Sequence, residues 1–305
     1  MRKLRIALLG LGDIAKKAYL PITASHDGIE PILCSRNSIV LNELKQKYRI
    51  NETYQNLTDL IDSQPDAIMV HSATDSHFSI AKQCLAAGIA TFVDKPISIS
   101  FAECQTLVDL AEMQNVPLYV GFNRPKAPLV SKLTAHNLHH VIWQKNRVNL
   151  PSSARDFIFN DFIHVVDGLL FLANRPQIEQ LENFHVTTHI EDNLLTRIHF
   201  SFTYQQTLFE GSMNRLSGVT EERIEVYSVN EKIQINSLTS GQHYRSGKYT
   251  PLSFNDWQSN LYQRGFNDMI EDWLTEVKSK KVNLAKLQAI LNSHRLCETL
   301  IEKIS

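Results

Sequence analysis

The stretch that decides the fold is LRIALLGLGDIA, residues 4–15. An apolar run ends at Leu9, a turn with Gly10 and Gly12 follows, and helical spacing begins at Ile14. A strand that enters a helix through a Gly-x-Gly-x-x-Ala turn is typical of dinucleotide-binding Rossmann domains, in which the helix N-terminus faces the phosphates. The alternative is a glycine-bearing turn of an unrelated α/β protein. We expect a nicotinamide dinucleotide here, with contacts from Gly10, Gly12, Asp13, Ile14 and Ala15.

Short apolar runs alternate with amphipathic segments as far as residue 122. The predicted strands are Leu4–Leu9, Pro31–Cys34, Ala67–Val70, Ala90–Val93 and Leu118–Val120. The predicted helices are Ile14–Ala24, Ile39–Tyr48, Leu57–Ile61, His77–Ala87 and Phe101–Gln114. Such alternation implies parallel strands joined by right-handed crossovers. Residues 1–122 are therefore expected to form an α/β domain, a Rossmann doubly wound parallel sheet.

After Phe122 the pattern changes to consecutive strands. One helix is predicted at Asp161–Leu172 and two more at Gln258–Lys278 and Ala285–Ile304. The predicted strands are Ile178–His189, Leu194–Tyr204, Thr207–Asn214, Arg223–Val229 and Lys232–Ile235. Strands without intervening helices indicate a large, mainly antiparallel open sheet. Residues 123–305 are expected to form an α+β domain for substrate binding and oligomerisation, with its C-terminal helices packing back on the N-terminal domain.

Composition limits the classes of partner. With 31 Lys plus Arg against 32 Asp plus Glu, the formal net charge of −1 gives no field that would attract nucleic acid or a membrane. Asp13 and the two lysines after it interrupt the N-terminal apolar run before it reaches signal-peptide length, so we expect a cytoplasmic protein. The 4 cysteines form no C-x-x-C pair and are expected to be reduced core residues.

The end of the second predicted strand bears on the choice of cofactor. Leu33-Cys34-Ser35-Arg36-Asn37 lies where NAD enzymes usually offer an acid to the ribose hydroxyls, and no acid is present. Arg36 could contact a 2′-phosphate that an aspartate would repel. NADP(H) is thus the preferred cofactor, with Ser35, Arg36 and Asn37 as contacts, and NAD(H) is the alternative. In that second case Arg36 caps a solvated loop or stacks on adenine.

Four segments resemble, in order and spacing, the Gfo/Idh/MocA family of NAD(P)-dependent oxidoreductases, in particular its MviM-like subgroup. They are the glycine turn, Ala73-Thr74-Asp75-Ser76-His77, Asp94-Lys95-Pro96 after Ala87-Gly88, and Gly121-Phe122-Asn123-Arg124. Segments around Asp161–Asp167 and Gly218–Tyr227 extend the resemblance over nearly the whole chain.

The resemblance implies further site residues. It places Ala73, Thr74, His77, Asp94, Lys95, Pro96 and Asn123 at the cofactor. It also implies that Lys95, at the carboxyl end of a strand, reaches both nicotinamide and substrate, which agrees with where open α/β sheets bind ligands. Asp94 departs from the glutamate that is common in the family.

A polar stripe interrupts the predicted helix at Asp161–Leu172. Asn160, Asp161, His164 and Asp167 recur at offsets of three and four among apolar residues, which favours a site or a satisfied internal network. The resemblance implies that His164 exchanges the substrate hydroxyl proton, helped by Lys95. The family has Asp where this chain has Asn160, so Asn160 could orient His164 but not act as a base. The alternatives are a core His164 held by Asp161 or Asp167, and a metal site, which we do not expect.

Two functions stay open. The first is hydride transfer between nicotinamide and a carbinol or ketone carbon of a sugar, cyclitol or polyol, with Lys95, His164, Asp161 and Asn160 in the catalytic site. The second is a non-catalytic regulatory protein that binds NADP(H) or a sugar, which the missing acid at Asn160 favours. By family analogy, the exposed face of the C-terminal sheet forms a homo-oligomer, a dimer or tetramer.

Overall fold

The computed structural model describes residues 2–304 and divides into two compact units. Unit 1 comprises Met1–Gly121 and Met269–Leu291, and unit 2 comprises Phe122–Asp268 and Asn292–Ser305. Both units are therefore discontinuous in sequence, because the chain returns to unit 1 after unit 2 has begun.

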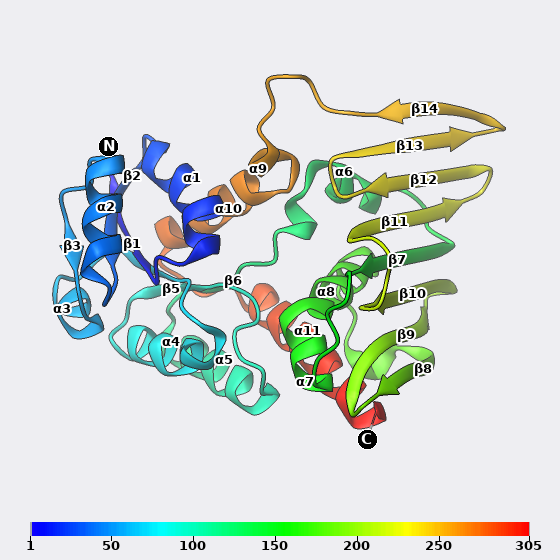
Figure 1. Cartoon of the computed structure of the whole chain (residues 1–305), viewed down its shortest axis with the longest axis horizontal. Helices are drawn as coiled ribbons and strands as arrows, with labels where there is room; N and C mark the ends of the chain where they lie inside the picture. Colours follow the sequence, from blue (N-terminus) through cyan, green and yellow to red (C-terminus); the bar gives the residue numbers. More distant parts are fainter. Residues whose placement is uncertain (1, 305) are drawn as a thin grey trace. The chain divides into compact units, whose positions relative to one another are not determined.

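The sheet of unit 1 has six parallel strands in the order β3-β2-β1-β4-β5-β6. Figure 1 labels β1, β2, β3, β5 and β6. The strands are β1 (Leu4–Leu9), β2 (Ile29–Cys34), β3 (Thr53–Tyr54), β4 (Ala67–Val70), β5 (Ala90–Val93) and β6 (Leu118–Val120). This is the strand order of a Rossmann fold. All five predicted strands are present, and β3 is an additional strand of two residues.

The helices of unit 1 lie close to their predicted positions. They are α2 (Ser38–Tyr48), α3 (Leu57–Asp62), α4 (His77–Ala86) and α5 (Phe101–Gln114), with a 3-10 turn η2 (Thr74–Ser76) before α4. The segment predicted as one helix after the glycine turn consists of a π-helix, η1 (Ala15–Tyr19), followed by α1 (Leu20–Ser25). Pro21 accounts for the change, because proline lacks the N–H that an α-helical bond to the preceding turn needs.

The later segment of unit 1 contributes to its core. This segment contains most of α10 (Phe266–Ser279) and the start of α11 (Leu284–Ile304). The Trp273 ring lies 5.8 Å from that of Tyr119 and 6.0 Å from that of Phe92, centroid to centroid. The Tyr119 hydroxyl donates to Asp272 at 2.8 Å.

The sheet of unit 2 has eight strands in the order β14-β13-β12-β11-β7-β10-β9-β8. They are β7 (His140–Asn146), β8 (Glu182–Glu191), β9 (Leu194–Tyr204), β10 (Thr207–Asn214), β11 (Glu221–Ser228), β12 (Glu231–Asn236), β13 (Ser240–Arg245) and β14 (Lys248–Leu252). All neighbouring strands are antiparallel except β7 and β10. The predicted fold class is confirmed, although β7, β13 and β14 were not predicted.

Two predicted helices of unit 2 have different limits. The helix expected at Asp161–Leu172 begins earlier and runs as α7 (Ala154–Phe157), the π-helix η5 (Ile158–Phe162) and α8 (Ile163–Leu172). The helix expected at Gln258–Lys278 is broken into α9 (Asn260–Gln263) and α10 at Gly265. Gly265 has a φ of +81°, and a Cβ there would lie 2.4 Å from backbone atoms of Asn123 and Ala127.

The remaining short elements of unit 2 are η3 (Arg124–Lys126), α6 (Pro128–Ser131), η4 (Lys132–Ala135) and η6 (Ile178–Gln180). η6 occupies the start of the segment that was predicted as one strand from Ile178. Within residues 2–304, no helix is long and apolar enough to cross a membrane.

Helix α8 packs closely on β7 and β10 because glycine stands at the contact. A Cβ on Gly168 would lie 2.2 Å from an atom of the Trp143 ring, which is fully buried. We expect Gly168→Ala to lower the free energy of unfolding by about 1–3 kcal/mol, since the extra methyl group overpacks the contact. Denaturant unfolding measures the change, and near-UV circular dichroism reports on the packing of the aromatic side chains, Trp143 among them. Gly218→Ala is the control, because no atom lies within 4 Å of its added Cβ; equal stability of the two variants would contradict the prediction.

Candidate functional site

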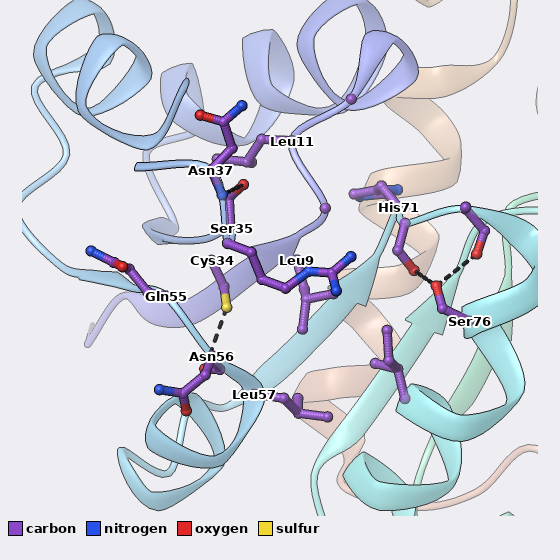
Figure 2. A pocket seen from close by; sticks show the side chains of 16 residues that line it. Leu9, Leu11, Cys34, Ser35, Asn37, Gln55, Asn56, Leu57, His71 and Ser76 are labelled. Atoms are coloured by element: carbon purple, nitrogen blue, oxygen red, sulfur yellow. Dashed lines mark hydrogen bonds between the residues drawn. The ribbon is translucent and has the colours of Figure 1, made fainter. Parts of the chain in front are cut away.

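A cavity of about 560 Å³ lies at the carboxyl ends of β1, β2 and β4 in unit 1 (Figure 2). Its lining residues are Leu9, Gly10, Leu11, Gly12, Cys34, Ser35, Arg36, Asn37, Gln55, Asn56, Leu57, His71, Ser72, Ala73, Ser76 and Ile80. Ligands of open α/β sheets bind at this edge. None of these lining residues is acidic, and Arg36 is the one basic side chain with a permanent charge among them.

The glycine turn has the geometry that a dinucleotide needs. Gly10 has a φ of +89°, and a Cβ there would lie 2.5 Å from the amide nitrogen of Ser72, so no other residue fits. At Gly12, apart from its chain neighbours, no atom of residues 2–304 lies within 4 Å of an added Cβ. Gly12 also lines the cavity, so a ligand could approach its backbone closely. The residues present therefore fit a pyrophosphate at the start of the following helix.

Ser35, Arg36 and Asn37 lie together on the rim of the cavity after β2. The Asn37 side chain accepts hydrogen bonds from Ile39 and Val40 at 3.1 and 3.2 Å, so it caps α2. The Ser35 hydroxyl accepts one from the Asn37 amide at 3.2 Å. The Arg36 side chain is exposed. The turn is thus held by its own hydrogen bonds while Arg36 extends from it.

The segment after β4 contains Ala73, which lines the cavity, and His77, which does not. His77 is 2% exposed, with Nδ1 2.8 Å from the Pro96 carbonyl oxygen and Nε2 2.9 Å from that of Ser72. The resemblance implied a cofactor contact for His77. In the structure these two contacts join the loops after β4 and β5, and a cofactor contact of His77 stays a prediction.

Asp94, Lys95 and Pro96 follow β5 directly, as expected, and the Lys95–Pro96 peptide is cis. Asp94 accepts from the Lys95 amide at 2.8 Å and from the Tyr19 hydroxyl at 3.3 Å. Burial raises the pKa of Asp94, and the nearby Lys95 opposes that shift. Lys95 itself is half-buried at the carboxyl end of the strand.

His71 is a cavity residue that the sequence analysis did not identify. It directly follows β4, its ring stacks on Tyr19 at 4.0 Å between centroids, and burial lowers the pKa of His71 to about 3. Within the described residues neither ring nitrogen has a hydrogen-bond partner. Its position after a strand that ends at the cavity is the signal that could have identified it.

In unit 2 the polar stripe meets a group of buried charges. Asp161 lies in η5 and accepts from Lys145, from Arg147 at 2.8 and 3.0 Å, and from Arg215 at 3.4 Å. Burial alone would raise the pKa of Asp161, but Arg147 and Lys145 hold it far below its usual value. Asp161 was expected as a member of the catalytic site, and the structure shows it as a carboxylate paired with three cations.

Arg124 connects this group to His164. Its guanidinium donates to both carboxylate oxygens of Glu222, at 3.2 and 3.0 Å, and to the Asn123 side chain at 2.7 Å. Arg124 Nη1 also lies 3.1 Å from His164 Nε2. Because arginine can only donate, His164 Nε2 must accept, which makes this ring neutral with its proton on Nδ1.

The other predicted residues of the stripe have partners of their own. The Asn160 amide donates to Asp156 at 3.3 Å. Asp167 accepts from Arg175 at 2.5 Å and from the Ser293 hydroxyl at 2.9 Å. Asn123 is 3% exposed and its amide donates to the Arg264 carbonyl at 2.8 Å, and its expected contact with the cofactor stays a prediction. Within residues 2–304, no three His, Cys, Asp or Glu side chains group as metal ligands.

Comparison with known sequences identifies the class of protein to which this fold and cavity belong. Residues 4–122 match an oxidoreductase family with an NAD-binding Rossmann fold, and residues 129–245 match the YceM-like C-terminal domain. A putative oxidoreductase, YceM of Salmonella typhimurium, is 30% identical over 308 residues, 98% of each chain. A myo-inositol 2-dehydrogenase of Thermotoga maritima is 29% identical over 122 residues, 40% of this chain and 36% of that one.

Two solved structures are similar along the whole chain. A Gfo/Idh/MocA oxidoreductase from Vibrio cholerae has a TM-score of 0.92 and 36% identity, with 99% of each chain covered. A dehydrogenase, MviM, from Clostridium difficile has a TM-score of 0.91 and 25% identity over 99% of this chain and 100% of that one. The protein is thus an oxidoreductase whose Rossmann unit binds a nicotinamide dinucleotide. It belongs to the Gfo/Idh/MocA family, as its motifs predicted.

Proposed function

We propose that the protein transfers a hydride between NADP(H) and a carbinol or ketone carbon of a sugar, cyclitol or related polyol. The observation that carries this proposal is the cavity at the glycine turn, with its open space beside Gly12. The name of the Thermotoga maritima relative, myo-inositol 2-dehydrogenase, supports the substrate class.

The rim of the cavity supports NADP(H) over NAD(H). Arg36 is exposed on the rim and offers a planar pair of donors to a 2′-phosphate. The lining residues include no carboxylate that would repel this dianion or bind a free ribose diol.

Arg36→Ala is expected to weaken NADPH binding by roughly 10- to 100-fold, the value of one or two charge-assisted hydrogen bonds. Binding of NADH should change little, since it lacks the 2′-phosphate. Fluorescence titration with each cofactor measures the two dissociation constants. Lys47→Ala removes an exposed positive charge from α2 and serves as the control. If wild-type protein binds NADPH and NADH equally, the preference for NADP(H) is refuted.

Lys95 and His164 are the residues that we propose for the chemistry. Lys95 would polarise the substrate oxygen and stabilise its developing charge. His164 would exchange the hydroxyl proton through Nε2, once the substrate hydroxyl replaces Arg124 as the hydrogen-bond partner of that nitrogen. Asn160 and Asp161 would keep the segment before His164 in place. The cofactor supplies the hydride or accepts it.

A screen of sugars, cyclitols, polyols and their ketones tests the activity, with the absorbance of NADPH as the readout. Turnover of a member of these classes by wild-type protein is the expected result. If NADPH binds tightly and no compound is turned over, a regulatory role replaces the enzyme.

For assembly, we propose a homo-oligomer formed through the exposed face of the unit 2 sheet in the cytoplasm. Sedimentation velocity of the full chain tests the oligomeric state, and a purely monomeric protein would refute the proposed homo-oligomer.

A further inference from the structure

Four cations converge in unit 2, and we call them the basic cluster: Arg124, Lys145, Arg147 and Arg215. The arrangement follows from the sheet, because β7 and β10 are parallel neighbours that end at the same edge. Arg147 follows β7, Arg215 follows β10, and the Arg147 amide donates to the Asn214 carbonyl at 2.9 Å. Lys145 is the last inward-facing residue of β7.

Two buried carboxylates face the basic cluster. Glu222 is the cross-strand neighbour of Lys145 and pairs with Arg124. Asp161 pairs with the other three cations. A third carboxylate, Asp156, acts on Arg215 from an exposed position. Four positive charges thus face two buried carboxylates and one exposed carboxylate.

Most of the basic cluster is removed from water. The exposed fraction of the side chain is 4% for Lys145, 5% for Arg215 and 12% for Arg124. Arg147 is the member that reaches solvent, with 33% exposed. Burying a charge without a counter-charge costs free energy, so the excess of positive over negative charge in the basic cluster needs compensation.

Some guanidinium N–H groups of the basic cluster have no hydrogen-bond partner among the described residues. Asp161 receives bonds from Arg147 through Nε and Nη2, and in the described residues Nη1 of Arg147 has no protein partner. The Nε of Arg215 also lacks a partner within residues 2–304, but it is buried and its guanidinium lies over the Phe157 ring at 4.4 Å, so Arg147 is the donor that an added anion can reach. Unused guanidinium donors beside a surplus of positive charge are what a carboxylate or phosphate requires.

Lys145 can relieve the surplus by losing its proton. Burial, with Arg124 and Arg147 nearby, lowers the pKa of Lys145 to about 7, although Asp161 and Glu222 oppose the shift. An added anion would favour the protonated lysine instead. The basic cluster can therefore exist in two states: with Lys145 neutral and no anion bound, or with Lys145 protonated and an anion bound.

We propose that the substrate carries an anionic group, a carboxylate or a phosphate, that binds at the exposed Arg147 edge of the basic cluster. This inference rests on the proposed function for its statement about substrate. The class is then an acidic or phosphorylated sugar or polyol, and neutral sugars are poor substrates because they leave the cations uncompensated.

The test uses the full chain saturated with NADPH, so that the cavity of unit 1 does not take up the added anions. Isothermal titration calorimetry at constant ionic strength measures binding of sodium gluconate, inorganic phosphate and neutral sorbitol. Gluconate or phosphate is expected to bind at least tenfold more tightly than sorbitol. Gluconate alone indicates a carboxylate, and phosphate alone indicates a phosphate.

Arg147→Gln should weaken binding of the preferred anion at least tenfold. Arg197→Gln, which removes an exposed arginine from β9, should leave it unchanged. If Arg147→Gln fails to fold, Arg147→Lys keeps the charge without the paired donors and should still weaken binding. Equal anion affinity of wild type and a folded Arg147 variant overturns the inference, as does equal binding of gluconate, phosphate and sorbitol.

The titration also separates this inference from the proposed function. NADPH binding without any anion binding refutes the basic cluster as a substrate site and leaves the oxidoreductase proposal standing. Failure to bind NADPH refutes the proposed function instead, and the anion titration without cofactor then still tests whether Arg147 holds an anion.

Discussion

Replacing Asp161 by asparagine is expected to lower the free energy of unfolding by about 3–5 kcal/mol. The substitution keeps the shape of the side chain but leaves Lys145, Arg147 and Arg215 without the carboxylate that they share. Lys145 and Arg215 are almost fully buried, so water cannot compensate their charges. Urea unfolding monitored by circular dichroism measures the change.

Asp192→Asn is the matched control, since Asp192 is exposed in the turn between β8 and β9. The dependence on pH gives a second check. The folded-state pKa of Asp161 is depressed, so its stabilisation is present above the unfolded pKa of about 3.9 and is lost as pH falls below that value. The deficit of Asp161→Asn should therefore shrink below about pH 4. A deficit of under 1 kcal/mol at pH 7 would show that the carboxylate is not needed.

Lys95→Ala is expected to reduce kcat by roughly 10²–10⁴, because a charged donor at the reacting oxygen acts mainly in the transition state. The dissociation constant of NADPH should change far less, since the cavity that includes Gly10, Gly12 and Arg36 is intact. Steady-state rates with whichever substrate the screen finds, together with cofactor titration, separate the two effects.

The control for Lys95→Ala is Lys82→Ala, which removes an exposed lysine from α4. A variant with normal kcat and weaker cofactor binding would assign Lys95 to binding alone. Loss of both would indicate a structural change at the adjacent Asp94, and a comparison of the near-UV circular dichroism spectra of variant and wild type checks for such a change.

Much of the Rossmann unit was predictable because its strands are buried on both faces and show as continuous apolar runs. β3 was missed, as two residues form no pattern. In unit 2, β13 and β14 are largely polar and exposed, so alternation does not reveal them. β7 was missed for another reason. Its inward positions are Val141, Trp143 and Lys145, and a charged residue at the third interrupts the apolar signal.

The candidate site likewise has parts with a local sequence signal and parts without one. The glycine turn and Ser35-Arg36-Asn37 are local signals, and the cavity includes both. The partners of Asp161 are 14, 16 and 54 residues distant in sequence and meet it only through the pairing of β7 with β10. No spacing rule relates them, so the sequence did not reveal that Asp161 pairs with three cations.

The discontinuity of unit 1 has a consequence for biosynthesis. Trp273 supplies part of the aromatic core around Phe92 and Tyr119, and Asp272 binds the Tyr119 hydroxyl. The ribosome makes the cofactor-binding half first, yet this half cannot complete its core until residue 291 has been synthesised. Residues 269–291 are synthesised only after most of unit 2. During translation, part of the apolar surface of the nascent Rossmann sheet therefore stays uncovered until this segment has been made.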